Sequence, residues 1–308
     1  MTKHKIDDYA IGVFYAIICY LAWGMFPLFW KQLAHVDAIQ VLAHRILWSF
    51  VFVSLIIVFS KRKKYLFVLK QPRTWKWLTL TGVLIGTNWV VYIYAINHGH
   101  IVESSFGYYI NPLMNVALGV LVLKERLPKL QIIAIGLAFV GIVVISIHLG
   151  RVPIISLVLA ITFALYGLYR KIANIDSMTA LMVETLILMP FSLGWIFYAQ
   201  NNGTGAFGSD TKTTLLLMIG GIITAIPLFW FGIATRKIPL STIGFIQYLS
   251  PTCQLALGIL VYKESFSIPH LIGFGFVWVA LTFFSVSIYQ HYSHSKKKSV
   301  EDKITFNK

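Results

Sequence analysis

Apolar stretches long enough to cross a bilayer repeat along almost the whole chain, with short polar segments between them. A helix of roughly 20 apolar residues spans the hydrocarbon core, which is about 30 Å thick. Such stretches occur at residues 9–30, 37–60, 75–96, 101–123, 130–148, 152–169, 178–199, 214–234, 240–262 and 269–290. Apolar residues make up 57% of the chain and charged residues 12%, which is more apolar surface than a soluble core encloses. The chain is therefore predicted to be an all-α integral membrane protein with ten transmembrane helices, and the lipid bilayer is its main partner.

The Lys and Arg residues are distributed unevenly between the two sides of these spans. With a cytoplasmic N-terminus, 21 of the 26 fall in cytoplasmic segments, four fall in outer segments, and Arg45 lies within a span. Cytoplasmic loops of membrane proteins carry such an excess. Both termini, including a basic tail at 291–308, are therefore predicted to be cytoplasmic. The net charge of +15 reflects this topology and does not indicate a nucleic-acid partner.

The chain matches itself when it is shifted by 139 residues. Asp37 falls on Asp176, Gly82 on Gly221, and ALGVLVLKE, ending at Glu125, falls on ALGILVYKE. The match predicts a first five-helix repeat at 9–148 and a second at 152–290. Because five is odd, the second repeat enters the membrane from the opposite side. Inverted repeats are typical of secondary transporters with a midplane site that opens alternately to each side. Some channels share this architecture, so a passive facilitator or channel is the alternative.

Two charged residues lie inside predicted spans at equivalent positions, Arg45 and Glu184. A charge at the centre of a membrane helix costs about 2.5–3.5 kcal/mol on insertion scales, so such residues mark pathways or partners. One hypothesis is that they pair with each other or share a substrate site. The other is a structural ion pair that only fixes helix packing. His44, beside Arg45, is a weaker candidate for coupling.

A polar stripe follows one face of the fourth span, and a second follows the ninth. Tyr108, Asn111 and Asn115 repeat at helical spacing after Ser104, and the equivalent positions include Gln247, Ser250 and Gln254. Polar groups in lipid must face protein or water, so the stripes predict a shared central cavity. The alternative is polar contact between packed helices. Pro112 and Pro251 are predicted to kink the two helices. Further candidates for lining the site are Asn88, Trp23, Trp89 and Tyr166.

Other chemistry has little support in the sequence. Glu103, at the outer start of the fourth span, is a candidate for proton coupling, although a solvated acid at a helix end is the alternative. Cys19 and Cys253 both lie in apolar stretches, which argues against a disulfide framework or a zinc site. There is no phosphate-binding loop, dinucleotide turn or metal motif. No metal, cofactor or enzymatic activity is therefore expected.

Five segments carry a family resemblance: AHRILWS (43–49), GTNW (86–89), ESSFGYYINPL (103–113), ALYGLYRK (164–171) and STIGFIQYLSPT (241–252). With them the chain resembles the RarD-type proteins of the EamA group, in the drug/metabolite transporter superfamily, over almost its whole length. The resemblance implies ten helices in two inverted repeats, in the cytoplasmic membrane of a bacterium. It also implies a central cavity for a small metabolite or drug-like molecule. Where some relatives have Glu, this chain has Gln40, which argues against proton coupling at that position. Substrate identity, direction of transport and oligomeric state are not encoded in these motifs.

Overall fold

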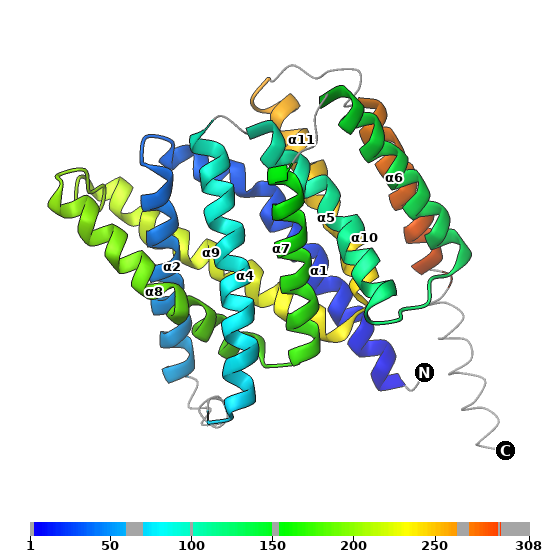
Figure 1. Cartoon of the computed structure of the whole chain (residues 1–308), viewed down its shortest axis with the longest axis horizontal. Helices are drawn as coiled ribbons and strands as arrows, with labels where there is room; N and C mark the ends of the chain where they lie inside the picture. The colour runs from blue at the N-terminus through cyan, green and yellow to red at the C-terminus, as the bar shows by residue number, and fades with distance from the viewer. Residues whose placement is uncertain are drawn as a thin grey trace.

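The computed structural model describes residues 3–59, 70–98, 101–149, 154–263, 271–288 and 290, and all regular structure in these ranges is helical. The predicted basic tail at 291–308 lies outside the described residues. The helices are α1 (Lys3–Trp30), η1 (Lys31–Leu33), α2 (Ala38–Phe59), α4 (Pro72–Asn97), α5 (Ile101–Leu121), α6 (Lys129–Leu149), α7 (Ile154–Ala173), α8 (Ser177–Asn201), α9 (Thr211–Lys237), α10 (Leu240–Gln247) and α11 (Leu249–Leu260). One more helix covers Leu271–Ile288 and runs beside α6 (Figure 1).

Eight stretches of the described residues are helical, long enough and apolar enough to cross a membrane. They comprise α1 with η1, α2, α4, α7, α8, α9, the combined α10 and α11, and Leu271–Ile288. The two remaining predicted spans coincide with α5 and α6, which are helices of 21 residues each. The prediction of an all-helical membrane protein is confirmed for the residues described.

Residues 139 positions apart adopt matching local structures. Asp37 accepts hydrogen bonds from the backbone N–H groups of Ile39 and Gln40 at the start of α2, at 3.0 and 3.1 Å. Asp176 does the same at the start of α8, where Met178 and Thr179 donate at 3.1 and 3.2 Å. Such caps satisfy amides that have no partner within the helix. Lys124 and Lys263, which follow α5 and α11, share a left-handed backbone with φ of 56°.

Helices of the first half of the chain pack mainly on helices of the second half. α1 packs along α9, α10 and α11, and α7 packs along α4 and α5. α2 lies between α8 and α9, and α5 crosses α10. The two halves therefore interlock in one bundle (Figure 1).

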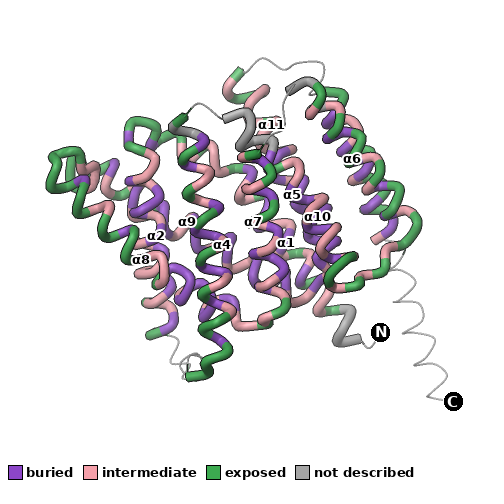
Figure 2. Tube along the Cα trace, viewed as in Figure 1, coloured by how far each residue is buried: buried purple, intermediate pink, exposed green. Residues whose placement is uncertain are grey.

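Buried residues gather on the inward faces of α1, α2, α7, α9 and α10 (Figure 2). Exposed apolar side chains form outward stripes, such as Val83, Val90 and Tyr94 on α4. α6 and the helix Leu271–Ile288 form an outlying pair, in which Gly141 packs against the backbone of Gly273. An apolar surface of this kind fits a lipid environment.

The two prolines predicted to kink helices lie at different places in their helices. The ninth predicted span is divided at Tyr248 into α10 and α11, whereas α5 continues unbroken through Pro112. Pro251 lies in the first turn of α11. Backbone N–H groups there have no acceptor within the helix, so a proline at this position removes no helical hydrogen bond. The interruption of the ninth span therefore precedes Pro251, and Pro112 lies within a continuous helix. The kinks at these two positions stay predictions.

Candidate functional site

Arg45 projects from α2 into a group of aromatic side chains inside the bundle. Its guanidinium carbon lies 4.7 Å from the ring centre of Trp30 on α1 and 5.3 Å from that of Trp89 on α4. Its Nε donates to Oγ1 of Thr224 on α9 at 2.9 Å. The Thr224 hydroxyl in turn donates to the Gly220 carbonyl at 2.8 Å. Cation–π contacts and this hydrogen bond hold the guanidinium in one place.

Two tyrosines complete what we call the Arg45 site, which consists of Arg45, Thr224, Trp30, Trp89, Tyr92 and Tyr108. The phenols of Tyr92 on α4 and Tyr108 on α5 lie edge to face, with ring centres 6.1 Å apart. Both are close enough to Arg45 to interact with it electrostatically. Arg45 is only partly buried and Tyr108 is 40% exposed, so protein atoms do not fully cover these two side chains. Of the residues predicted from sequence, the structure brings together Arg45, Trp89 and Tyr108 here.

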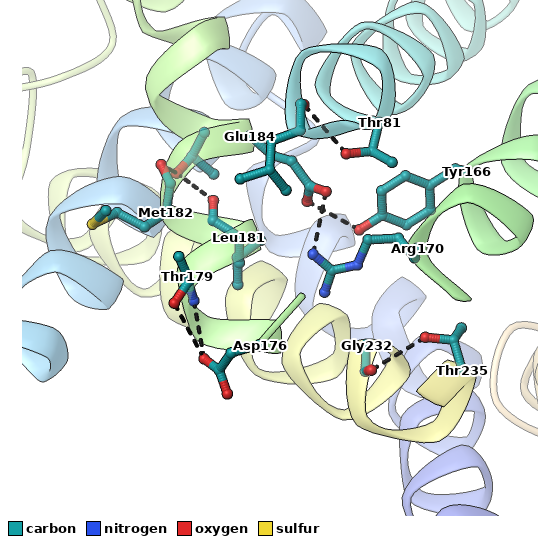
Figure 3. Close-up of polar contacts among 12 residues, drawn as sticks. Thr81, Tyr166, Arg170, Asp176, Thr179, Leu181, Met182, Glu184, Gly232 and Thr235 are labelled. Carbon is teal, nitrogen blue, oxygen red and sulfur yellow. Dashed lines mark hydrogen bonds and ion pairs between the residues drawn. The ribbon is translucent and has the colours of Figure 1, made fainter. Parts of the chain in front are cut away.

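Glu184 does not pair with Arg45. Its Oε1 accepts a hydrogen bond from Nη1 of Arg170 on α7 at 3.2 Å, and its Oε2 accepts from the Tyr166 hydroxyl at 3.2 Å (Figure 3). The side chains of Arg170 and Glu184 are 3% and 2% exposed. Of the two hypotheses for Glu184, the structural ion pair therefore describes it, with Arg170 in place of Arg45.

The sequence interpretation missed Arg170 because it counted this residue among the cytoplasmic loop charges. Arg170 lies one helical turn after Tyr166, so the two side chains share a face of α7. That spacing was the available signal for a buried role. Gly232 on α9 allows this arrangement, because a Cβ atom there would lie 2.1 Å from Nη2 of Arg170.

The polar stripe of α5 forms a closed cluster of amides where α5 crosses α10. Asn115 donates to the side-chain oxygens of Asn111 and Gln247 at 3.1 and 2.7 Å. Gln247 donates to Asn111 at 2.6 Å, and Asn111 donates to the Ala160 carbonyl at 2.7 Å. All three amides are at least 95% buried. In this structure they join helices, as the alternative interpretation of the stripe expected.

The remaining predicted site residues lie elsewhere in the bundle. Asn88 donates to the Leu159 carbonyl and to Thr162, which ties α4 to α7. Gln254 donates to the Trp23 carbonyl at 3.3 Å. Trp23 packs edge to face against Tyr20 and Phe163, and the fully buried Tyr166 stacks on Phe231. None of these four contacts a residue of the Arg45 site in the interactions described. The side chain of Glu103 lies outside the described residues.

Gln40 and His44 hold the loop between α8 and α9 against α2. The Gln40 amide donates to the Thr204 carbonyl and accepts from the Ala206 N–H, both at 2.8 Å. The His44 ring stacks on Phe207 with ring centres 5.1 Å apart. His44 thus packs against this loop, and the amide of Gln40 provides both the donor and the acceptor that the loop backbone needs.

Gln40→Ala is expected to release this loop, because the change leaves both backbone groups without their partner at a cost of about 1–3 kcal/mol. The measurement is the rate of tryptic cleavage after Lys212, the basic residue next to the loop, in detergent-solubilised protein. Gln32→Ala is the matched control, since Gln32 is exposed and its one described hydrogen bond goes to the Leu28 carbonyl at the end of α1. Equal cleavage rates in the two variants would contradict the role assigned to Gln40.

The described residues contain no group of three or more His, Cys, Asp or Glu side chains that could hold a metal ion. The structure is that of a polytopic helical membrane protein with charged and amide side chains buried between its helices. The model of the EamA-like transporter family matches residues 10–147 and again residues 151–286. The chain therefore belongs to the EamA-like transporter family.

Two bacterial proteins are similar to the chain over nearly the whole of both sequences. The uncharacterized transporter YojE of Bacillus subtilis is 40% identical over 280 residues, which cover 90% of this chain and 94% of YojE. Protein RarD of Escherichia coli is 38% identical over 275 residues, which cover 89% and 93%. A solved crystal structure superposes with a TM-score of 0.70 at 16% identity, over 89% of this chain and 97% of that one, and shows the fold alone. The resemblance to RarD-type proteins is confirmed.

Proposed function

We propose that the chain forms ten transmembrane helices in two inverted repeats, 9–148 and 152–290, with both termini in the cytoplasm. The double match of the family model supports this arrangement, as do the paired caps at Asp37 and Asp176. The packing is also related by the repeat: α1 packs on α9, and α7, its equivalent, packs on α4. Relatives from bacteria support a place in the cytoplasmic membrane.

The function that the site supports best is secondary transport of a small metabolite or drug-like molecule by alternating access. The observation that carries this proposal is Arg45, a partly exposed guanidinium inside the bundle with no carboxylate partner among the described residues. A charged side chain within a membrane span costs free energy, so it is expected to serve a function. Here we expect that it binds the transported substrate. Helices from both halves of the chain surround it, and rocking one half against the other would expose it to each side in turn.

A cysteine at position 108 tests alternating access without knowledge of the substrate. The background is Cys19→Ser and Cys253→Ser, and Tyr108→Cys places the reporter in the Arg45 site. A charged, membrane-impermeant thiol reagent is expected to label it in both right-side-out and inside-out vesicles, while glutathione trapped in the lumen stays unmodified. Val90→Cys is the control, because Val90 is on the exposed stripe of α4 and should not react from either side.

Other outcomes exclude the proposal in distinct ways. Labelling that is accompanied by loss of the trapped glutathione would mean that the reagent passes through, as in a channel or passive facilitator. Labelling from one side alone would mean that the site does not alternate.

A further inference from the structure

The Arg45 site presents hydrogen-bond donors that the protein itself does not use. Nε of Arg45 is bound by Thr224, but the two terminal nitrogens make no hydrogen bond to any residue that the structure describes. The hydroxyls of Tyr92 and Tyr108 likewise have no hydrogen-bond partner there. A guanidinium fork of this kind matches the two oxygens of a carboxylate.

The charges around the site limit the ligand to one negative charge. Thr224 on α9, Trp30 on α1, Trp89 and Tyr92 on α4, and Tyr108 on α5 are uncharged, and Glu184 is occupied by Arg170. Arg45 is therefore the single described charge at the site. A monoanion would neutralise it, a cation would be repelled, and a dianion would leave an unpaired negative charge in a low-dielectric interior.

The aromatic side chains define the rest of the ligand. Trp30 rests on the α9 backbone, where a Cβ atom at Gly220 would lie 3.3 Å from its ring. Together with Trp89 it fixes the position of the guanidinium, and Tyr108, which is 40% exposed, has a ring that protein atoms do not fully cover. Flat apolar groups stack on such rings. A ligand with an aromatic portion next to its acid group would use both halves of the site.

We propose that the Arg45 site binds an aromatic monocarboxylate, with the carboxylate on the terminal nitrogens of Arg45 and the ring against Trp89 and Tyr108. This inference names the substrate class of the proposed transporter and so rests on that function. Binding at equilibrium and two-sided labelling are separate measurements, so the two proposals can fail separately.

Calorimetric titration of the protein in lipid nanodiscs tests the class with three probes. N-benzoylglycinate carries the ring and the carboxylate, N-benzoylglycinamide lacks the charge, and N-acetylglycinate lacks the ring. The wild-type protein is expected to bind N-benzoylglycinate about tenfold or more tightly than either of the others, since hydrogen bonds to charged groups and ring stacking each contribute.

Variants of Arg45 and Trp89 test which residue binds the carboxylate and which binds the aromatic ring. Arg45→Gln should abolish the difference between the acid and the amide, and Arg45→Lys should keep only part of it because the fork is lost. Trp89→Leu should weaken binding of N-benzoylglycinate more than that of N-acetylglycinate, because only the first probe also loses its ring contact. Arg73→Gln, at the exposed start of α4, is the matched control and should leave all three affinities unchanged. Arg45→Gln should fold normally, because it removes a charge that has no acidic partner among the described residues.

Equal affinity for the acid and the amide, or unchanged selectivity in Arg45→Gln, would overturn the proposal. Equal affinity for the two acids would overturn its aromatic part. If the folded wild-type protein bound none of the probes, the substrate class would be wrong. Two-sided labelling at position 108 would then still decide whether the protein is a carrier.

Discussion

Glu184→Gln is expected to lower the free energy of unfolding by about 3–5 kcal/mol, the usual cost of removing one partner from a buried ion pair. Arg170 is 4% exposed, and its Nη2 has no hydrogen-bond partner in the described part of the chain. Without the carboxylate, its guanidinium would remain charged and buried, because arginine does not release its proton in proteins. The neighbouring Tyr166 hydroxyl would also lose its charged acceptor.

Removing the other partner of the pair, in Arg170→Met, is expected to lower the free energy of unfolding by less. A carboxyl group left alone can bind a proton and become neutral, and the Tyr166 hydroxyl can still donate to it. The double variant Arg170→Met with Glu184→Gln should recover most of the loss, because no charge is then buried. Replacing both partners of a buried pair is often neutral or stabilising.

Thermal unfolding in detergent micelles, followed by the loss of monodisperse protein, measures these differences. Glu125→Gln makes the same chemical change at a partly exposed helix cap, where the carboxylate accepts from the Leu240 and Ser241 N–H groups at 2.7 and 2.9 Å and from the Ser241 hydroxyl at 2.6 Å. It should cost less than the change at Glu184, about 1–2 kcal/mol. A double variant as unstable as Glu184→Gln alone would show that charge pairing is not what holds this position.

The sequence contains enough information to predict the spans but not their partners. Hydropathy identifies apolar stretches because lipid demands them along the whole length of a helix. The offset of 139 residues pairs Asp37 with Asp176, and both cap helices, because a cap depends only on local backbone. The Arg170–Glu184 pair depends on how α7 and α8 are rotated against each other. That rotation is set by packing and leaves no simple trace in either segment.

The difference between local features and contacts between helices also explains why the roles of the polar stripe and of Trp30 could not be predicted. Helical spacing correctly places Asn111 and Asn115 on one face, but whether that face meets water or Gln247 depends on how α5 crosses α10. Trp30 ends α1, so position alone assigns it to the membrane interface. The close approach of α1 to Gly220 brings its ring over Arg45 instead. Residues that act through contacts between helices were the ones that sequence periodicity could not assign.

Gly221→Ala is expected to lower stability and Gly82→Ala is not, although the two glycines are equivalent positions of the repeat. At Gly221 on α9, a Cβ atom would lie 2.5 Å from the carbonyl carbon of Trp48 and 2.6 Å from the backbone nitrogen of Ser49. These are backbone atoms of α2 that cannot rotate away. Overpacking of this kind costs about 1–3 kcal/mol. It would also strain the bond from the Ser49 hydroxyl to the Gly221 carbonyl, which is 2.8 Å long.

At Gly82 on α4, the nearest atoms to a Cβ would be those of Ile187 and Glu184 on α8, at 3.5 and 3.6 Å, which is ordinary van der Waals contact. Alanine there gains up to about 1 kcal/mol of helix propensity over glycine. The midpoint of thermal unfolding should therefore fall for Gly221→Ala and stay level or rise for Gly82→Ala.

The two glycine variants also test whether the packing of α9 against α2 positions Arg45. Ser49 lies one turn beyond Arg45 on α2, so a displacement of α2 at Gly221 moves the guanidinium relative to Trp30 and Thr224. Gly221→Ala should weaken binding of N-benzoylglycinate, whereas Gly82→Ala, which contacts α8, should leave it unchanged. Equal responses in stability and binding would mean that the two interfaces are alike. The close approach of α9 to α2 would then not be what positions Arg45.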